Sequence, residues 1–167
     1  FRSSRGCRRS PDSGVLTYRE ATGLKKFLSE SDQKAIVESI KAAELCTSGE
    51  IRVHVEPDCK VANPLDRAVE VFGLLKMHET RERNGVLIYI AYNSHQFAII
   101  GDKGIDERVP ANFWEGAKTT LAGFLKQGKA AEGICRVISE VGDNLSLYFP
   151  HKDDDINEQS DEISFGE

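Results

Sequence analysis

The strongest constraint on the fold is a run of seven consecutive apolar residues, 86–92, with the sequence VLIYIAY. Apolar side chains at both odd and even positions require a strand that is covered on both faces. The run is far shorter than the roughly 18 residues of a membrane-spanning helix, and no apolar run in the chain is longer. We therefore expect a central strand of an α/β protein and no transmembrane segment.

The segments around this strand predict its neighbours in the sheet. Residues 51–56 alternate apolar and polar side chains, as a strand does when it has one covered face or lies at an edge. A helix opened by Pro64 separates this strand from residues 86–92, and a right-handed crossover of this kind makes the two strands parallel. After a tight turn at 93–94, residues 96–101 return as the second strand of a β-hairpin. The predicted sheet is therefore small and mixed.

Helical periodicity predicts about four helices around this sheet. Ser29 and Asp32 resemble a capping pair that begins the first helix, and Pro64 begins the second. We expect Pro110 to open the third, and a fourth to run towards Pro150. The predicted fold class is α/β, a three-layer α/β/α sandwich whose mixed sheet combines a parallel crossover with a β-hairpin.

Composition divides the 167 residues into one domain and two flanking segments. Residues 1–24 are rich in Arg, Ser and Gly without periodicity, and we expect a leader that is disordered or added to the natural protein. Residues 25–150 contain the periodic segments and form the predicted domain. Residues 151–167 are acidic and poor in large apolar side chains, so we expect a disordered tail.

Charge and cysteine usage exclude several classes of function. The net charge is −5 and the basic residues cluster in residues 1–20, so the domain lacks the basic face of a nucleic-acid-binding protein. The cysteines have neither a close pair nor a histidine at zinc-finger spacing, which predicts free thiols; they are Cys7, Cys46, Cys59 and Cys135. Free thiols without a targeting signal predict a cytoplasmic protein, and we expect a monomer.

Two loops hold the polar residues best suited to chemistry. Asn84 precedes the buried strand, whereas Asp102 and Asp106 follow the hairpin. The second strand of a hairpin ends beside the start of its first, so these loops should be neighbours. Their oxygens are ligands that a hard divalent cation prefers. Asn-Gly and Gly-Asp pairs are also common in turns, so spacing alone leaves both a metal site and ordinary turns open.

Three segments resemble the TPM-domain family, which includes a plant thylakoid acid-phosphatase-like protein linked to photosystem repair, an animal receptor accessory membrane protein and many bacterial proteins. They are SGEIRV at 48–53, RNGVL at 83–87 and FAIIGDKGI at 97–105. The resemblance extends over residues 25–149 and is greatest to the small soluble bacterial branch.

The resemblance implies an α/β/α sandwich with a divalent-cation site, calcium being the expected ion, and a weak phosphatase activity. Positions within the motifs imply Asn84, Asp102, Asp106 and Glu50 as metal ligands, although a helix-to-strand turn alone would explain Glu50. In a metal-dependent phosphomonoester hydrolase, the cation would polarise the phosphoryl group and hold the attacking water. The alternative is a non-enzymatic interaction or assembly module in which the cation orders a loop. The implied partners are a metal ion and either a phosphoester or a protein.

Two positions depart from the pattern of this family. Arg83 stands where many relatives have an aspartate directly before the Asn-Gly pair. Asn93 and Ser94 stand where many relatives have two aspartates at the hairpin turn. Both departures remove carboxylates, so we expect weaker cation binding than in those relatives.

Overall fold

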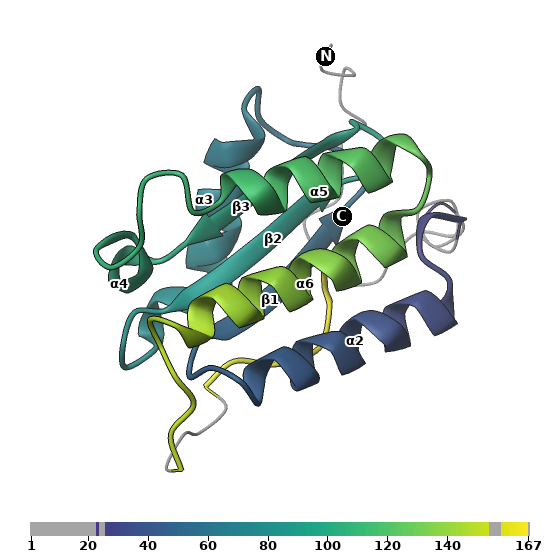
Figure 1. Cartoon of the computed structure of the whole chain (residues 1–167). Helices are drawn as coiled ribbons and strands as arrows, with labels where there is room; N and C mark the ends of the chain where they lie inside the picture. Colours follow the sequence, from purple (N-terminus) through teal and green to yellow (C-terminus); the bar gives the residue numbers. More distant parts are fainter. Residues whose placement is uncertain (1–22, 24–25, 154–157, 167) are drawn as a thin grey trace.

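The computed structural model describes residues 23, 26–153 and 158–166. The predicted leader therefore lies outside the described residues except for Gly23. The sheet has four strands in the order β3-β2-β1-β4 and is open, with helices on both faces (Figure 1). The predicted α/β fold with a layered arrangement is confirmed.

The three longer strands have the predicted directions. β1 (Glu50–Glu56) runs parallel to β2 (Gly85–Ala91), with Ile51 opposite Val86. β3 (Gln96–Gly101) is antiparallel to β2. Every residue of β2 is buried, as its uninterrupted apolar sequence requires for a strand covered on both faces.

More helices cover one face of the sheet than the other (Figure 1). The apolar sides of α2 (Glu30–Glu44), α5 (Glu115–Lys126) and α6 (Ala130–Ser146) form the larger core with one face. On the opposite face, α3 (Pro64–Leu74) and the 3-10 turn η1 (Met77–Glu79) form a smaller core. Together these layers form the predicted sandwich.

The helix starts follow local hydrogen bonding. Before α2, Ser29 Oγ accepts the N–H of Asp32 at 3.2 Å, and Asp32 Oδ2 accepts the N–H of Ser29 at 3.0 Å, which is a complete capping box. The prediction that Pro110 opens the next long helix is wrong, because α5 begins only at Glu115. The intervening turn packs the rings of Phe113 and Trp114 edge to face, 4.7 Å apart, against the larger core.

The acidic C-terminal segment differs from its prediction. β4 (Ser164–Phe165) pairs in parallel with the outer edge of β1, and the N–H of Gly166 donates to the carbonyl of Val55 at 2.9 Å. Ile163 joins the larger core with 8% of its surface exposed. The expected disorder is therefore wrong for this stretch, because the open edge of β1 offers backbone hydrogen bonds and the core accepts Ile163.

Four further sequence-based expectations concern the chain as a whole. Within residues 23, 26–153 and 158–166, no helix has the length and apolar character needed to cross a bilayer. Cys46, Cys59 and Cys135 are free thiols, and Cys7 lies outside the described residues. Cytoplasmic location and the monomeric state stay predictions.

Candidate functional site

The loop before β2 and the loop after β3 lie directly against each other. The N–H of Asp102 donates to the carbonyl of Gly85 at 2.9 Å, and the N–H of Gly104 donates to that of Arg83 at 2.8 Å. A Cβ at Gly104 would overlap the carbonyl oxygen of Glu82 and lie 2.6 Å from that of Arg83. Glycine at this position therefore allows the two backbones to approach, and the neighbourhood predicted from the hairpin is confirmed.

Both carboxylate oxygens of Asp102 are bound by protein groups. Arg83 Nε lies 2.8 Å from Asp102 Oδ2, and Arg83 Nη2 lies 3.0 Å from Oδ1. Oδ1 also accepts the N–H of Lys103, so Asp102 caps the short helix α4 (Lys103–Asp106). The hydrogen bonds and charge of Asp102 raise the pKa of the exposed Arg83. A metal ion at Asp102 would therefore have to displace the guanidinium of Arg83.

Asn84 is almost completely buried and turns towards other partners. Its Nδ2 donates to Ser48 Oγ at 3.3 Å and to Glu82 Oε2 at 3.4 Å, and its backbone N–H donates to Thr80 Oγ1 at 3.2 Å. Its Oδ1 is buried and has no hydrogen-bond partner among the described residues. The Asn84 side chain is thus held by Ser48 and Glu82.

Asp106 lies on the exposed side of α4. Partial burial raises the pKa of its carboxyl, and the negative charge of nearby Asp102 raises it further. Its neighbours in a shallow groove are mainly apolar and include Trp114. Asp106 is thus close to Asp102, as predicted, but in a solvated position.

Glu50 is buried and faces the C-terminal segment. Its Oε1 accepts the backbone N–H of Glu158 at 2.9 Å, whereas its Oε2 is buried without a hydrogen-bond partner among the described residues. Glu44, at the end of α2, hydrogen-bonds to Glu50 through their side chains, and its Oε1 accepts the N–H of Ile51 at 3.0 Å. Asp161 hydrogen-bonds to Glu44 through their side chains, which brings three carboxyl groups to this edge of β1.

The titration of these groups reflects burial and mutual repulsion. Burial, the side-chain hydrogen bond to Asp161 and the charge of Glu50 together raise the pKa of Glu44 to about 10, with burial the largest cause. Burial also raises the pKa of Glu50, although the N–H of Glu158 favours its charged form. The group thus binds a proton readily, because burial and the neighbouring carboxyl groups disfavour its fully charged form.

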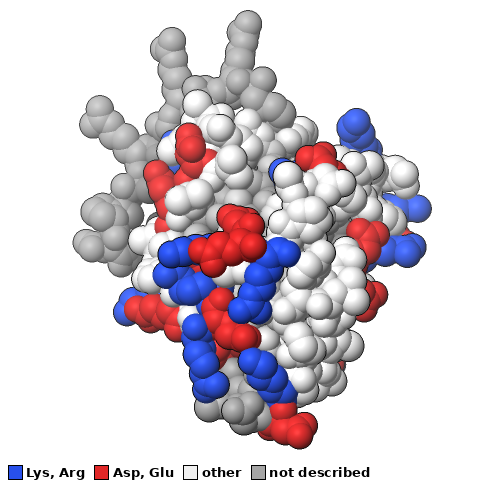
Figure 2. All heavy atoms as spheres, turned by 60° about the vertical axis from the view of Figure 1, so that its left-hand side comes forward, with Lys and Arg blue, Asp and Glu red and all other residues white. Residues whose placement is uncertain are grey.

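The four predicted ligands do not converge on one point. Asp102 pairs with Arg83, Asp106 faces solvent, Asn84 contacts Ser48, and Glu50 meets the C-terminal segment. In the described part of the chain, no group of three or more His, Cys, Asp and Glu side chains is arranged to hold a metal ion. The end of the molecule that carries α4 shows basic and acidic side chains intermixed, rather than a purely acidic surface (Figure 2).

A second buried polar cluster lies at the far end of β1, beneath α3. Arg67 donates to both carboxylate oxygens of Glu56, at 2.9 and 3.0 Å, and the hydroxyl of Tyr89 also donates to Glu56. His54 Nε2 lies 3.4 Å from Glu56, and His54 Nδ1 lies 3.0 Å from Ser164 Oγ. Burial alone would raise the pKa of Glu56, but these hydrogen bonds lower it to about 2. The cluster is a buried, internally neutralised ion pair.

Sequence reasoning missed several members of both clusters. In the sequence, Glu44 lies in the last turn of an amphipathic helix and Asp161 lies in an acidic C-terminal segment, so neither position indicates a cluster. Arg67 and Tyr89 lie within apolar stripes, where their polar groups give no periodic signal. The one usable signal was Glu56, a carboxylate at the end of a strand that enters the core.

Comparison with known proteins identifies the family of this chain and structures with the same fold. The family model of the TPM domain matches residues 22–144. The solved NMR structure of the BA42 protein from the psychrophilic bacterium Bizionia argentinensis is 44% identical, with a TM-score of 0.79 over 84% of this chain and 96% of that one. The N-terminal domain of cg2496 from Corynebacterium glutamicum shares the fold at 15% identity, with a TM-score of 0.59 over 98% of this chain and 95% of that one. The comparison with curated proteins gave no match. On the family model and the 44% identity, this chain belongs to the TPM-domain family.

Proposed function

We propose that this domain binds a divalent cation, with calcium as the expected ion, at the edge of β1 through Glu50 and the neighbouring Glu44 and Asp161. The observation that carries the proposal is the contact of three carboxyl groups, Glu44, Glu50 and Asp161, around the buried Oε2 of Glu50, to which no N–H group of the described residues donates. Burying several carboxyl groups together is costly unless a positive charge or a proton offsets their charge, and a cation at this oxygen would remove the cost.

The composition of this group suits a hard cation. Glu44, Glu50 and Asp161 supply carboxylate oxygens, which are the preferred ligands of Ca²⁺. Their like charges repel one another, and a doubly charged ion would replace the proton that the group otherwise holds. The side chains are not arranged as a finished coordination shell, so binding would draw them together.

The proposal moves the site away from the predicted loop residues. Asp102 already has a cationic partner in Arg83, and Asp106 is solvated. Asn84 keeps an unpartnered Oδ1, but its amide is held by Ser48 and Glu82. These three residues form at most a weaker second position for a cation.

Of the phosphatase activity that the resemblance implies and its non-enzymatic alternative, we propose the alternative, an interaction module. Glu50 is only 4% exposed, and the backbone of Glu158 donates to its Oε1. A phosphoester therefore has no open approach to a cation held there. The cation would instead fasten the segment that contains Asp161 onto the body of the domain.

Calcium binding measured by isothermal titration calorimetry tests the proposal. Glu50→Gln removes the charge and keeps the shape, and we expect it to weaken calcium binding by about tenfold or more. Asp102→Asn is the matched control, and its affinity should stay within about twofold of the natural chain. Equal loss in both variants, or loss in Asp102→Asn alone, would return the site to the loops.

A phosphomonoester assay separates the two activities. The purified chain should show no turnover of a chromogenic phosphomonoester with calcium, magnesium or manganese at any pH between about 5 and 9. Metal-dependent turnover that disappears in Glu50→Gln would instead establish the enzyme.

A further inference from the structure

A cavity of about 570 Å³ opens at the opposite end of the sheet from the candidate cation residues. It lies where β2 ends at Ala91, whereas Glu50 and Asn84 lie where β1 and β2 begin. Ligands of open α/β sheets usually bind beyond the carboxyl ends of the parallel strands, as this cavity would allow. Its volume is within the range of small-molecule sites, roughly 300–1,000 Å³.

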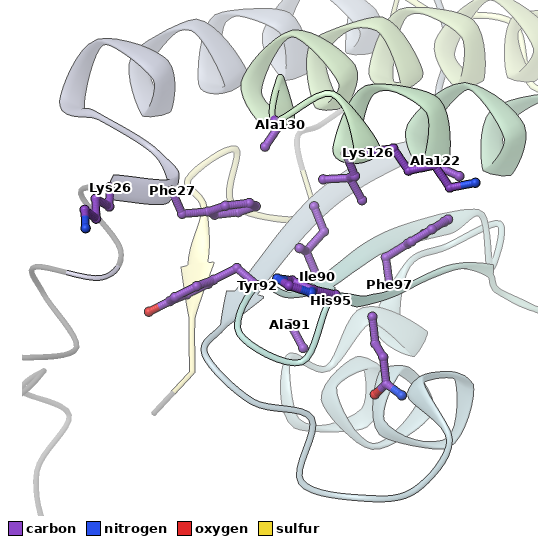
Figure 3. A pocket seen from close by; sticks show the side chains of 13 residues that line it. Lys26, Phe27, Ile90, Ala91, Tyr92, His95, Phe97, Ala122, Lys126 and Ala130 are labelled. Atoms are coloured by element: carbon purple, nitrogen blue, oxygen red, sulfur yellow. The ribbon is translucent and has the colours of Figure 1, made fainter. Parts of the chain in front are cut away.

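The walls of the cavity are aromatic and aliphatic. The rings of Phe27 and Tyr92 stack, with centroids 5.1 Å apart and planes inclined by 17°. Phe97 from β3, Leu125 from α5 and Ile90 from β2 contribute further apolar surface, and Figure 3 shows Ile90 beside Phe97. Phe27, Tyr92 and Phe97 are each only partly buried, so their rings offer surface to a flat apolar ligand.

Two lysines are the charged residues among the described lining of the cavity. Lys26, Lys126 and His95 line it, and none of the described lining residues is Asp or Glu. The described lining is thus basic although the whole chain has more acidic than basic residues, 27 against 22. In addition, α6 begins at Ala130 on the cavity wall, and its N-cap Lys129 makes no capping hydrogen bond through its side chain. The positive end of that helix adds to the attraction for an anion.

We propose that this cavity binds a small aromatic carboxylate. The rings would hold the planar body, and the exposed side chains of Lys26 and Lys126 would turn from their present positions to meet the carboxylate in partly solvated ion pairs. This site is separate from the proposed cation site, and neither proposal depends on the other.

A titration followed by ¹H–¹⁵N NMR tests the proposal with a defined probe, 2-naphthoate, on the full chain. We expect saturable shifts in the amides of residues 90–92, 96–97 and 125–130. The uncharged isostere 2-naphthalenemethanol should bind about fivefold more weakly, since it lacks the charge that the lysines recognise. Shifts scattered over the surface, or equal affinity for the two probes, would overturn the proposal.

Two variants with matched controls localise the effect. Lys126→Glu should weaken 2-naphthoate by about fivefold, while Lys60→Glu, an exposed lysine that does not line the cavity, should leave it unchanged. Ala122 is half-buried in α5 and lines the cavity, so Ala122→Trp should fill the cavity and abolish binding. Ala42→Trp, on the exposed side of α2, should leave binding unchanged. Unchanged binding in Lys126→Glu and Ala122→Trp, with native spectra, would exclude this cavity.

Discussion

Arg83 and Asp102 form a two-pronged ion pair, with Nε 2.8 Å from Oδ2 and Nη2 3.0 Å from Oδ1. Arg83 reaches this position from a left-handed backbone conformation, with φ of 52°. The guanidinium supplies within the chain the positive charge that a bound ion would otherwise bring to Asp102. Arg83 therefore neutralises Asp102 from within the chain and occupies the place where a cation could contact this carboxylate.

The substitution Arg83→Asp should turn this corner into a cation site. It removes the competing guanidinium and adds a carboxylate beside Asp102 and Asp106. We expect calcium to shift the amides of residues 102–106 in the variant, with a dissociation constant of about 1 mM, and not in the natural chain. Without calcium, the variant should melt at a lower temperature because the carboxylates repel one another.

The matched control is Arg81→Asp, an exposed position in the same loop. It should give no calcium-dependent shift in residues 102–106. If calcium does not shift the amides of residues 102–106 in Arg83→Asp, or shifts them equally in Arg81→Asp, then Arg83 does not occupy the place of a cation at Asp102.

The contact at Gly104 should be sensitive to a single methyl group. A Cβ there meets the carbonyl oxygens of Glu82 and Arg83, which belong to the backbone and cannot turn aside. We expect Gly104→Ala to lower the free energy of unfolding in urea by about 2–4 kcal/mol. Gly123→Ala in α5, where a Cβ meets nothing within 4 Å, should raise it by about 0.5–1 kcal/mol. Equal stability of the two variants would mean that the loops do not meet as described.

The buried Glu56 should make stability depend on acid. Its pKa is lowered to about 2 in the folded state, below the unfolded value of 4.5, so its contribution is complete above pH 4.5 and is lost as pH falls towards 2. The shift corresponds to about 3 kcal/mol of unfolding free energy. Urea denaturation at pH 5 and pH 2.5 should show this loss in the natural chain and a smaller one in Glu56→Gln. The same loss in both would assign the acid sensitivity to other groups.

The C-terminal segment should contribute to global stability. Ile163 is 8% exposed within the larger core, and Ile163→Ala should lower the free energy of unfolding by about 2 kcal/mol. Phe165→Ala is the control, because that ring is 38% exposed and should cost less than about 1 kcal/mol. Two variants as stable as the natural chain would restore the prediction of a disordered tail.

Local signals predicted most of the fold. The apolar run, with hydrophobic residues at both odd and even positions, forms the buried strand β2. Ser29 and Asp32 form the capping box of α2. These features depend on neighbours within a few residues, which a sequence displays directly. β4 depends instead on the open edge of β1, about 110 residues away, and its two residues carry no periodic signal.

The candidate site was predictable only in its backbone. Hairpin topology placed the loops of Asn84 and Asp102 together, and this holds. Side-chain direction did not follow from topology, because Asn84 turns to Ser48 while Arg83 turns to Asp102. The carboxyl group of Glu50 contacts Glu158 and Asp161 only because the C-terminal segment packs against β1. No local sequence pattern indicates that contact.

The measurement that tests the central claim most directly is a calcium titration of the ¹⁵N-labelled natural chain. Cation binding at the edge of β1 should move the amides of Glu50, Ile51, Glu158 and Asp161 together, with one dissociation constant, while those of residues 102–106 stay in place. Shifts confined to residues 83–106, or no saturable shift at up to about 10 mM calcium, would contradict the account.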